Sequence, residues 1–482
     1  MKPNDITRYL AWGAALVACA TVLPLQGCDT TVLNVTDPDI ILEQNTNSAS
    51  GALALKNGVL FRLEQTVGGV QGGPEALFMY GALITDEWRS GDTFVQRNNQ
   101  DQRIWEPQNT FNPGAYRGLN RVRVEGERAI PLLRHWVPDS TYYIGQMFAV
   151  TAYVEALIGE HYCNGTPLSD VAGTSVVYGA PLTNDSLYGL AIATSDSAIA
   201  EANTSVARGD SALALPPTQT DTAKYRAIRN QGLRIRRLAQ VIQGRALLDR
   251  AQYAAAAAAV AGVPDTFRYQ VTYSTNSASN QIWSLNASAK RYTMVDREGS
   301  NGLDFISAND PRVPRQIAAA NDLIFDTGFS LPVVREGIWG RSSPITIVSG
   351  VEARLIEAEN ALQTAPGTWL TLINTLRTNA ALYPPIQTGF SRGPTLTNLV
   401  DPGTQPARVD IMFRERAFWM FSTGHRLGDM RRLVRQYGRD PLTVYPIGGF
   451  YKGGVYGDAY MMSVPFDEVN NPNFTQCIDQ NP

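Results

Sequence analysis

The sequence predicts a mostly α-helical protein, with a scaffold of tetratricopeptide-like helix pairs, long irregular insertions and little β-structure. Helical patterns recur in neighbouring pairs that are joined by short turns containing Pro, Gly or Asp. The second helix of one pair, AQYAAAAAAVAG at 251–262, is rich enough in alanine to let helices approach closely, as in tetratricopeptide repeats. Segments rich in Asn, Ser, Thr, Gly and Pro separate the pairs and favour loops.

The N-terminus has the pattern of a lipoprotein signal peptide over residues 1–27. Lys2 and Arg8 come before an apolar run of about 15 residues, which is too short to span a membrane. Leu-Gln-Gly-Cys at 25–28 matches the bacterial lipobox, in which the cysteine is lipidated. We therefore expect Cys28 to begin an anchored mature chain, with residues 28–36 as a tether. Ordinary secretion, with Cys28 incidental, is the alternative.

We expect residues 37–482 to form one domain. Its helical scaffold is predicted at about 37–66, 115–262, 344–380 and 405–438, and its irregular insertions at about 67–114, 263–343, 381–404 and 439–482. Within the scaffold, helices are predicted at 115–134, 140–162, 184–207, 225–248, 250–261, 347–363 and 368–380. Short strands are predicted at 271–273 and 331–334 in the long insertion.

Charge and motif content exclude several functions. A net charge of −3 without a basic tract argues against a nucleic-acid partner. The three histidines are far apart and no Cys/His ligand spacing occurs, so we expect no metal and no cofactor, although His161 and Cys163 form a lone H-x-C pair. No GxSxG element marks a hydrolase nucleophile. A glycosidase needs two facing carboxylates, and only the loop with Asp86, Glu87 and Asp92 leaves that alternative open.

Two cysteines remain after Cys19 and Cys28 are assigned to the signal and the lipid anchor. Cys163 and Cys477 are an even pair in a chain destined for an oxidising compartment, so a disulfide between them is expected. Two separate thiols are the alternative, because sequence alone does not place them within bonding distance.

The segment 409–432, VDIMFRERAFWMFSTGHRLGDMRR, organises the rest of the chain. Its apolar residues cover more than one stripe of a helix, so a helix here is buried on most sides. Gly424 permits a break before a second helix. Buried charges need partners, so the charged residues predict an internal network that locks the two helices together, with a catalytic role as the alternative. These residues are Glu415, Arg416, Arg426, Asp429, Arg431 and Arg432.

The same residues resemble the C-terminal signature of the SusD/RagB family. Glu415-Arg416, Gly424, Arg426, Asp429 and Arg431-Arg432 follow its order, while Trp419 and Thr423 stand where the family usually has glutamates. Further similar elements are VEARLIEAE at 351–359, WLTLINTLR at 369–377, VPFDE at 464–468 and NPN at 471–473.

This resemblance implies a SusD-like fold and a function without catalysis. Family members are lipoproteins on the outer face of the outer membrane, where they capture oligosaccharides or peptides. They deliver these nutrients to a SusC-like TonB-dependent transporter. Two other functions stay open: a lipid-anchored glycan-active hydrolase, and a transporter lid without its own ligand.

Candidate ligand residues follow from the chemistry of sugar binding. Flat aromatic faces cover the CH side of a sugar ring, and planar polar groups pair with its hydroxyls. Such residues occur at Trp88, Arg89 and Asp92 in the first insertion and at Trp283, Tyr292 and Trp339 in the second. Each aromatic residue is alternatively buried beneath its own loop.

Overall fold

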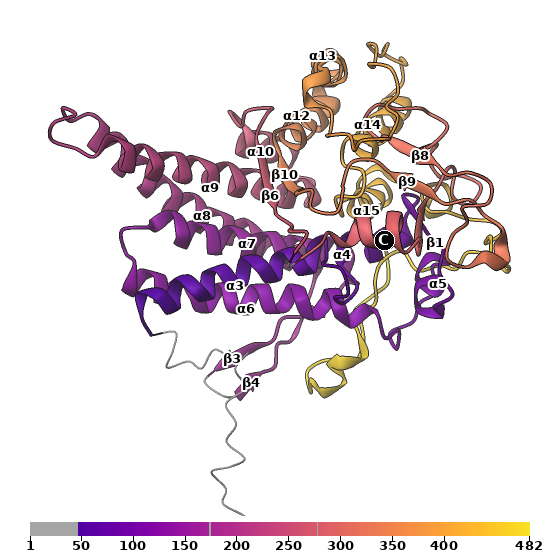
Figure 1. Ribbon diagram of the computed structural model, residues 1–482, viewed down its shortest axis with the longest axis horizontal. Helices are drawn as coiled ribbons and strands as arrows, with labels where there is room; N and C mark the ends of the chain where they lie inside the picture. Colours follow the sequence, from indigo (N-terminus) through magenta and orange to yellow (C-terminus); the bar gives the residue numbers. More distant parts are fainter. Residues whose placement is uncertain (1–46, 173–174, 277) are drawn as a thin grey trace, which may run out of the picture. The chain divides into compact units, whose positions relative to one another are not determined.

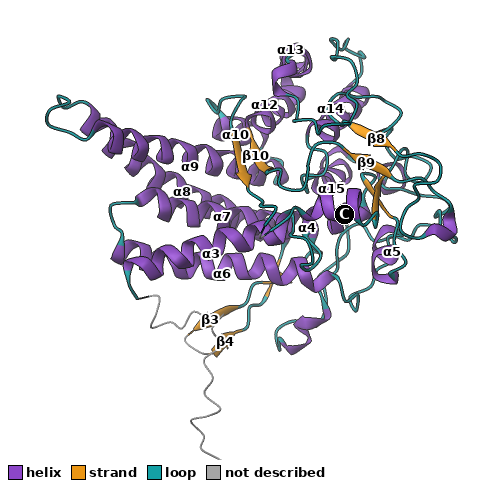
Figure 2. Ribbon diagram, viewed as in Figure 1, coloured by secondary structure: helices purple, strands orange, loops and turns teal. Residues whose placement is uncertain are grey.

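The computed structural model describes residues 47–172, 175–276 and 278–482. The predicted signal peptide, Cys28, the tether and the beginning of the scaffold segment predicted from residue 37 lie outside these residues. Helices dominate the described chain and its strands are short, which confirms the predicted mostly α-helical class (Figure 2). No helix in this part of the chain is long and apolar enough to cross a membrane.

Five long helices form the first part of the scaffold, in which α3 packs on α6, α6 on α7, α7 on α8 and α8 on α9. Figure 1 shows the five helices running alongside one another. They are α3 (Ala49–Val67), α6 (Asn112–Trp136), α7 (Thr141–His161), α8 (Asn184–Leu213) and α9 (Thr222–Asp249). The Thr183 side chain caps α8 by accepting a hydrogen bond from the Ser186 N–H. Helix α7 has no polar stripe and is buried on almost every side, which makes it the centre of the core.

The second part of the scaffold contains α10 (Tyr253–Val260), α12 (Gly350–Thr364), α13 (Pro366–Thr378), α14 (Gln405–Trp419) and α15 (Arg426–Tyr437). The alanine-rich α10 packs closely on α9, because a Cβ atom added to Gly244 of α9 would lie 2.5 Å from Val260 Cγ1. A separate core cluster joins α12, α13 and α14, where the Trp369 indole N–H lies 3.3 Å from Met412 Sδ.

Several predicted boundaries were wrong, and the strands expected at 271–273 and 331–334 span Arg268–Val271 and Val334–Glu336 instead. The helix expected from 347 begins at Gly350, because Ser349 caps it by accepting from the Glu352 N–H, and 345–349 is a strand. Helix α8 continues through Gly209 to Leu213. A short helix, α5 (Val95–Asp101), lies in the first insertion, where only irregular structure was expected.

The strands are short, and in the described residues they form five two-stranded antiparallel sheets within and beside the insertions. These pair β1 (Trp88–Ser90) with β7 (Tyr292–Met294), β6 (Arg268–Val271) with β10 (Ile345–Ser349), β8 (Arg315–Ile317) with β9 (Val334–Glu336), β2 (Thr166–Pro167) with β5 (Pro181–Leu182), and β3 (Asp170–Ala172) with β4 (Ser175–Val177). The β1–β7 pair joins the first insertion to the second, with Arg89 opposite Thr293. The remaining elements are α4 (Leu77–Tyr80), η1 (Gly81–Ile84), α11 (Gln281–Trp283), η2 (Ser284–Ser288), η3 (Thr327–Phe329), η4 (Ala380–Leu382), α16 (Pro441–Val444) and η5 (Phe466–Asn470).

A disulfide ties the C-terminal tail to the end of α7. Cys163 and Cys477 are bonded, with their Cα atoms 6.0 Å apart. Backbone hydrogen bonds flank it, from the Cys163 N–H to the Met462 carbonyl and from the Ile478 N–H to the Asn164 carbonyl. The tail is therefore part of the folded unit.

Candidate functional site

The charges of α14 and α15 form a buried ion-pair network. Asp429 accepts from Arg416 Nε at 2.8 Å and from Arg432 Nη2 at 2.7 Å, and Arg432 also pairs with Glu359 of α12 at 2.5 Å. Burial opposes the ionisation of Asp429, but the two arginines outweigh it and hold its pKa below the ordinary value. The carboxylate is therefore charged in the folded protein and depends on its partners.

The network extends well beyond the predicted lock between two helices. Glu415 pairs with Arg312 of the second insertion at 2.5 Å and with Arg377 of α13. Arg426 makes two hydrogen bonds to Asp86, at 2.7 and 2.8 Å, and Arg431 donates to three backbone carbonyls at the end of α7. The signature residues thus tie the helix pair to α7, α12, α13 and two insertions.

Gly424 provides the sharp break between α14 and α15. Its φ is +81°, and an added Cβ atom would lie 2.4 Å from the Phe78 ring. A side chain here would be strained and would also collide with the first insertion.

Glu87 is a buried carboxyl group whose ionisation the fold resists. It accepts a hydrogen bond from the Ser422 N–H at 2.9 Å, and its Oε2 atom has no hydrogen-bond partner. Burial raises its pKa to about 8, against the opposing effects of Ser422 and Arg426. The folded state therefore keeps this proton at pH values where the unfolded chain releases it.

Between pH 5 and pH 8, Glu87 should reduce the stability of the parent protein. In this window the unfolded chain has released the Glu87 proton while the folded protein still holds it. The free energy of unfolding of the parent protein therefore falls as the pH rises toward 8. The variant Glu87→Gln should lose less stability over this window, by at least about 1 kcal/mol. Urea unfolding at both pH values measures this, and parallel pH profiles of the two proteins would contradict it.

Four of the six predicted ligand residues are buried, and three of these are engaged by neighbouring side chains in the interior; both findings correct the sequence analysis. Trp88 is fully buried and donates its indole N–H to Ser422 Oγ at 2.9 Å. The buried Tyr292 hydroxyl donates to Glu75 at 2.7 Å. Asp92 is buried against Arg291 at 2.6 Å and against Arg97. Side chains alternate along a strand, so the strands that place Trp88 and Tyr292 in the core turn Arg89 outward.

The other predicted residues have mixed positions. Trp339 is buried, and it lines a cavity of about 80 Å³ together with Trp419 and Thr423. Trp283 is half-buried, with the Arg341 guanidinium 5.6 Å from its ring centroid. Arg89 is partly exposed and pairs with Glu298 at 2.6 Å. These six residues therefore do not form one site, and two of them border the exposed cluster described next: the Arg89 guanidinium lies 4.6 Å from the Tyr451 ring centroid, and Asp92 pairs with Arg291.

An exposed aromatic cluster, here called the aromatic platform, lies where the insertions meet. It consists of the rings of Phe94, Phe325, Phe329 and Tyr451 with the cations Arg291 and Lys452. Phe94, Phe325 and Phe329 are 45%, 44% and 41% exposed. Three separate insertions contribute, and the elements around them group on one side of the unit, away from the α8–α9 turn (Figure 1).

Cations fix the rings of the aromatic platform. The Arg291 guanidinium lies 5.0 Å from the Phe94 ring centroid and 3.8 Å from that of Phe325. Lys452 lies 5.1 Å from the Phe329 ring centroid and pairs with Asp326 at 2.7 Å. Rings so held offer apolar surface at little cost in entropy.

Sequence reasoning missed Phe94, Phe325, Phe329 and Tyr451. It favoured tryptophans, which fill large buried spaces in this protein, as Trp88 and Trp369 do. A usable signal was present at 325–329, Phe-Asp-Thr-Gly-Phe, where two aromatic residues flank a turn motif that ordinarily carries polar neighbours.

The residues that the sequence offered for metal or acid chemistry are buried or engaged in the described structure. Cys163 is in the disulfide, so it offers no thiolate beside His161. Asp86, Glu87 and Asp92 are all buried, so none of these carboxyl groups is open to a substrate. Within the described residues, no three His, Cys, Asp or Glu side chains gather as metal ligands.

No protein-family model and no curated protein matches the sequence, but solved structures match its fold. A SusD superfamily protein from Bacteroides vulgatus ATCC 8482 is 12% identical, with a TM-score of 0.56 over 90% of this chain and 99% of that chain. A SusD-like carbohydrate-binding protein from Bacteroides fragilis NCTC 9343 is 13% identical, with a TM-score of 0.60 over 89% and 99%. A SusD/RagB family protein from Bacteroides thetaiotaomicron VPI-5482 is 12% identical, with a TM-score of 0.56 over 81% and 89%. The resemblance read from the sequence is confirmed at the level of the fold: this chain has the fold of the SusD superfamily.

Proposed function

We propose that this chain is an outer-membrane lipoprotein of the SusD/RagB type, which binds an oligosaccharide nutrient and delivers it to a SusC-like TonB-dependent transporter. The observation that carries the proposal is the aromatic platform, which three insertions build on a SusD-like scaffold. A carbohydrate-binding function stated for SusD-like structures from B. fragilis and B. vulgatus supports it. Lipidation at Cys28 would hold the protein at the cell surface beside its transporter.

The chemistry of the platform suits binding without cleavage. Phenylalanine rings cover the CH face of a sugar, while Lys452 and Arg291 keep the rings in place. A hydrolase would need two accessible carboxyl groups across the scissile bond. The hydrolase alternative rested on three acids, Asp86, Glu87 and Asp92. All three are buried and bonded to other protein groups. A binding protein is therefore favoured over the hydrolase.

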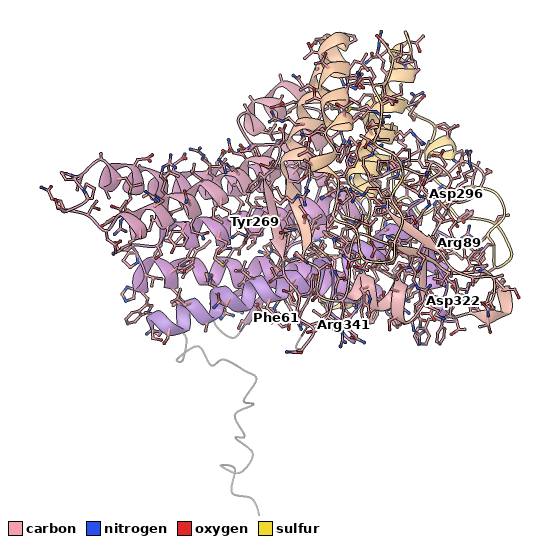
Figure 3. All side chains as sticks on the ribbon, turned by 45° about the horizontal axis from the view of Figure 1, so that its top comes forward. Phe61, Arg89, Tyr269, Asp296, Asp322 and Arg341 are labelled. Atoms are coloured by element: carbon pink, nitrogen blue, oxygen red, sulfur yellow. A yellow bond between two sulfur atoms is a disulfide. The ribbon has the colours of Figure 1, made fainter. Side chains whose placement is uncertain are left out.

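Removing the two central rings tests the proposal. The double variant Phe325→Ala/Phe329→Ala should weaken oligosaccharide binding about tenfold or more, because two stacking surfaces are lost. Titration calorimetry against a panel of neutral and acidic oligosaccharides measures this. The matched control is Phe61→Ala, which removes a ring of similar exposure (47%) on α3, away from Arg89 (Figure 3). A parent protein that binds no oligosaccharide, or a double variant that binds like the parent, would contradict the proposal.

A further inference from the structure

A second concavity, here called the arginine cavity, lies between α3, α5 and the start of α6. It has a volume of about 490 Å³. Its walls carry Arg62, Arg97, Arg117 and Arg121, and Glu75 is the one carboxyl group among the lining residues. Glu75 is already engaged by Arg97 and by the Tyr292 hydroxyl. The lining is therefore cationic in a chain with a net charge of −3.

The arginines differ in how far their charge is satisfied. Arg62 pairs with Glu125 at 2.7 Å, and the exposed Arg117 pairs with Asp467 at 2.5 Å. Arg97 is buried against Glu75 and Asp92, yet its Nε atom has no hydrogen-bond partner. Across the described ranges, no carboxylate pairs with Arg121, which is exposed at the rim. An incoming anion would therefore meet a guanidinium at Arg121 that is unpaired in the described structure, while the Arg97 Nε atom is enclosed by the protein.

The start of α6 adds to the positive potential of the cavity. No side chain caps this helix and its first turn contains no acidic residue. The N-terminal end of a long helix carries partial positive charge, which favours anions. Gly118 lets the helix approach α3, because an added Cβ atom would lie 2.5 Å from Thr66 Oγ1.

The arginine cavity adjoins the aromatic platform. Phe111 lines the cavity and packs edge-to-face on Phe94 of the platform, with ring centroids 5.7 Å apart. The Arg97 guanidinium lies 5.2 Å from the Phe111 centroid and 5.7 Å from that of Phe94. One extended ligand can therefore lie on the rings and place a substituent among the arginines.

We propose that the arginine cavity binds an anionic substituent of the oligosaccharide on the platform, which makes the natural ligand an acidic glycan. The substituent is a uronic acid carboxylate or a sulfate ester, since arginine recognises both through paired N–H groups. This inference rests on the proposed function and narrows its substrate class. Neutral glycans use the platform alone and bind more weakly.

Calorimetry with three classes of oligosaccharide, uronic acid, sulfated and neutral, tests the inference. The parent should bind one acidic class about tenfold more tightly than the neutral class, and Arg121→Gln should remove that advantage while leaving neutral binding unchanged. Arg121 has no carboxylate partner in the described structure, so this variant should fold normally. The matched control is Arg226→Gln, which removes an exposed arginine of α9. The preferred acidic class identifies the substituent.

Raising the salt concentration should weaken acidic but not neutral binding. Equal affinity for acidic and neutral glycans would overturn the inference and leave the proposed function intact. If Arg121→Gln weakened acidic and neutral binding equally, the inference would also be overturned, because Arg121 would then act on the aromatic platform and not on an anionic substituent. If Phe325→Ala/Phe329→Ala still bound acidic oligosaccharides like the parent, the claim that one ligand occupies both the platform and the arginine cavity would be overturned. A parent that binds none of the three classes would refute the proposed function as well.

Discussion

Replacing Asp429 by alanine is expected to lower the free energy of unfolding by about 3–5 kcal/mol, the usual cost of breaking a buried ion pair from one side. The change leaves the buried Arg416 and Arg432 without their shared carboxylate. Arg432 still pairs with Glu359 after this change, so Arg416 loses more of the negative charge that compensates it. Urea unfolding followed by circular dichroism measures the effect.

The control for this variant is Asp210→Ala on α8. Asp210 pairs with Arg229 at 2.5 Å, but both side chains are largely exposed, and such pairs are worth under about 1 kcal/mol. If Asp429→Ala unfolded like the parent and lost only glycan binding, the network would be part of a ligand site and our structural assignment would be wrong.

Removing the disulfide is expected to have a second large effect. The double variant Cys163→Ser/Cys477→Ser should lower the free energy of unfolding by about 2–5 kcal/mol, because the bond closes a loop of 314 residues in the unfolded chain. Thermal unfolding of the parent, with and without reductant, measures the same quantity. Reduced parent and double variant should agree.

The disulfide also predicts where the chain opens first. The tail after Met462 also accepts hydrogen bonds from Tyr116 and Arg117, but the disulfide is its one covalent cross-link in the described residues. Limited proteolysis of the double variant should therefore cut there before the helices. Equal unfolding temperatures for parent and variant, with an uncut tail, would show that the packing alone holds this segment.

The scaffold could be predicted because its signals are local. Apolar periodicity and turn residues located most of the long helices to within a few residues, and the Ser349 cap accounts for the later start of α12. The charged signature of α14 and α15 could be recognised because buried charges require fixed partners. Their partners, such as Arg312 and Glu359, lie far away in sequence and could not be named.

The aromatic platform as a whole could not be predicted, because exposure in a loop depends on long-range packing. Trp88 and Arg89 are adjacent, yet strand alternation buries Trp88 fully and leaves Arg89 partly exposed. Phe94, Phe325 and Tyr451 come together only when three insertions fold onto each other. Nothing in their separate neighbourhoods records that contact.

The most direct measurement is a pulldown through a tag on the intact, lipidated protein from detergent-solubilised outer membranes. The proposed function predicts recovery of a large β-barrel transporter in near-equal amounts, as expected for an interface on the order of 2,000 Å² or more. Recovery of this protein alone, under conditions in which it still binds oligosaccharide, would contradict delivery to a transporter.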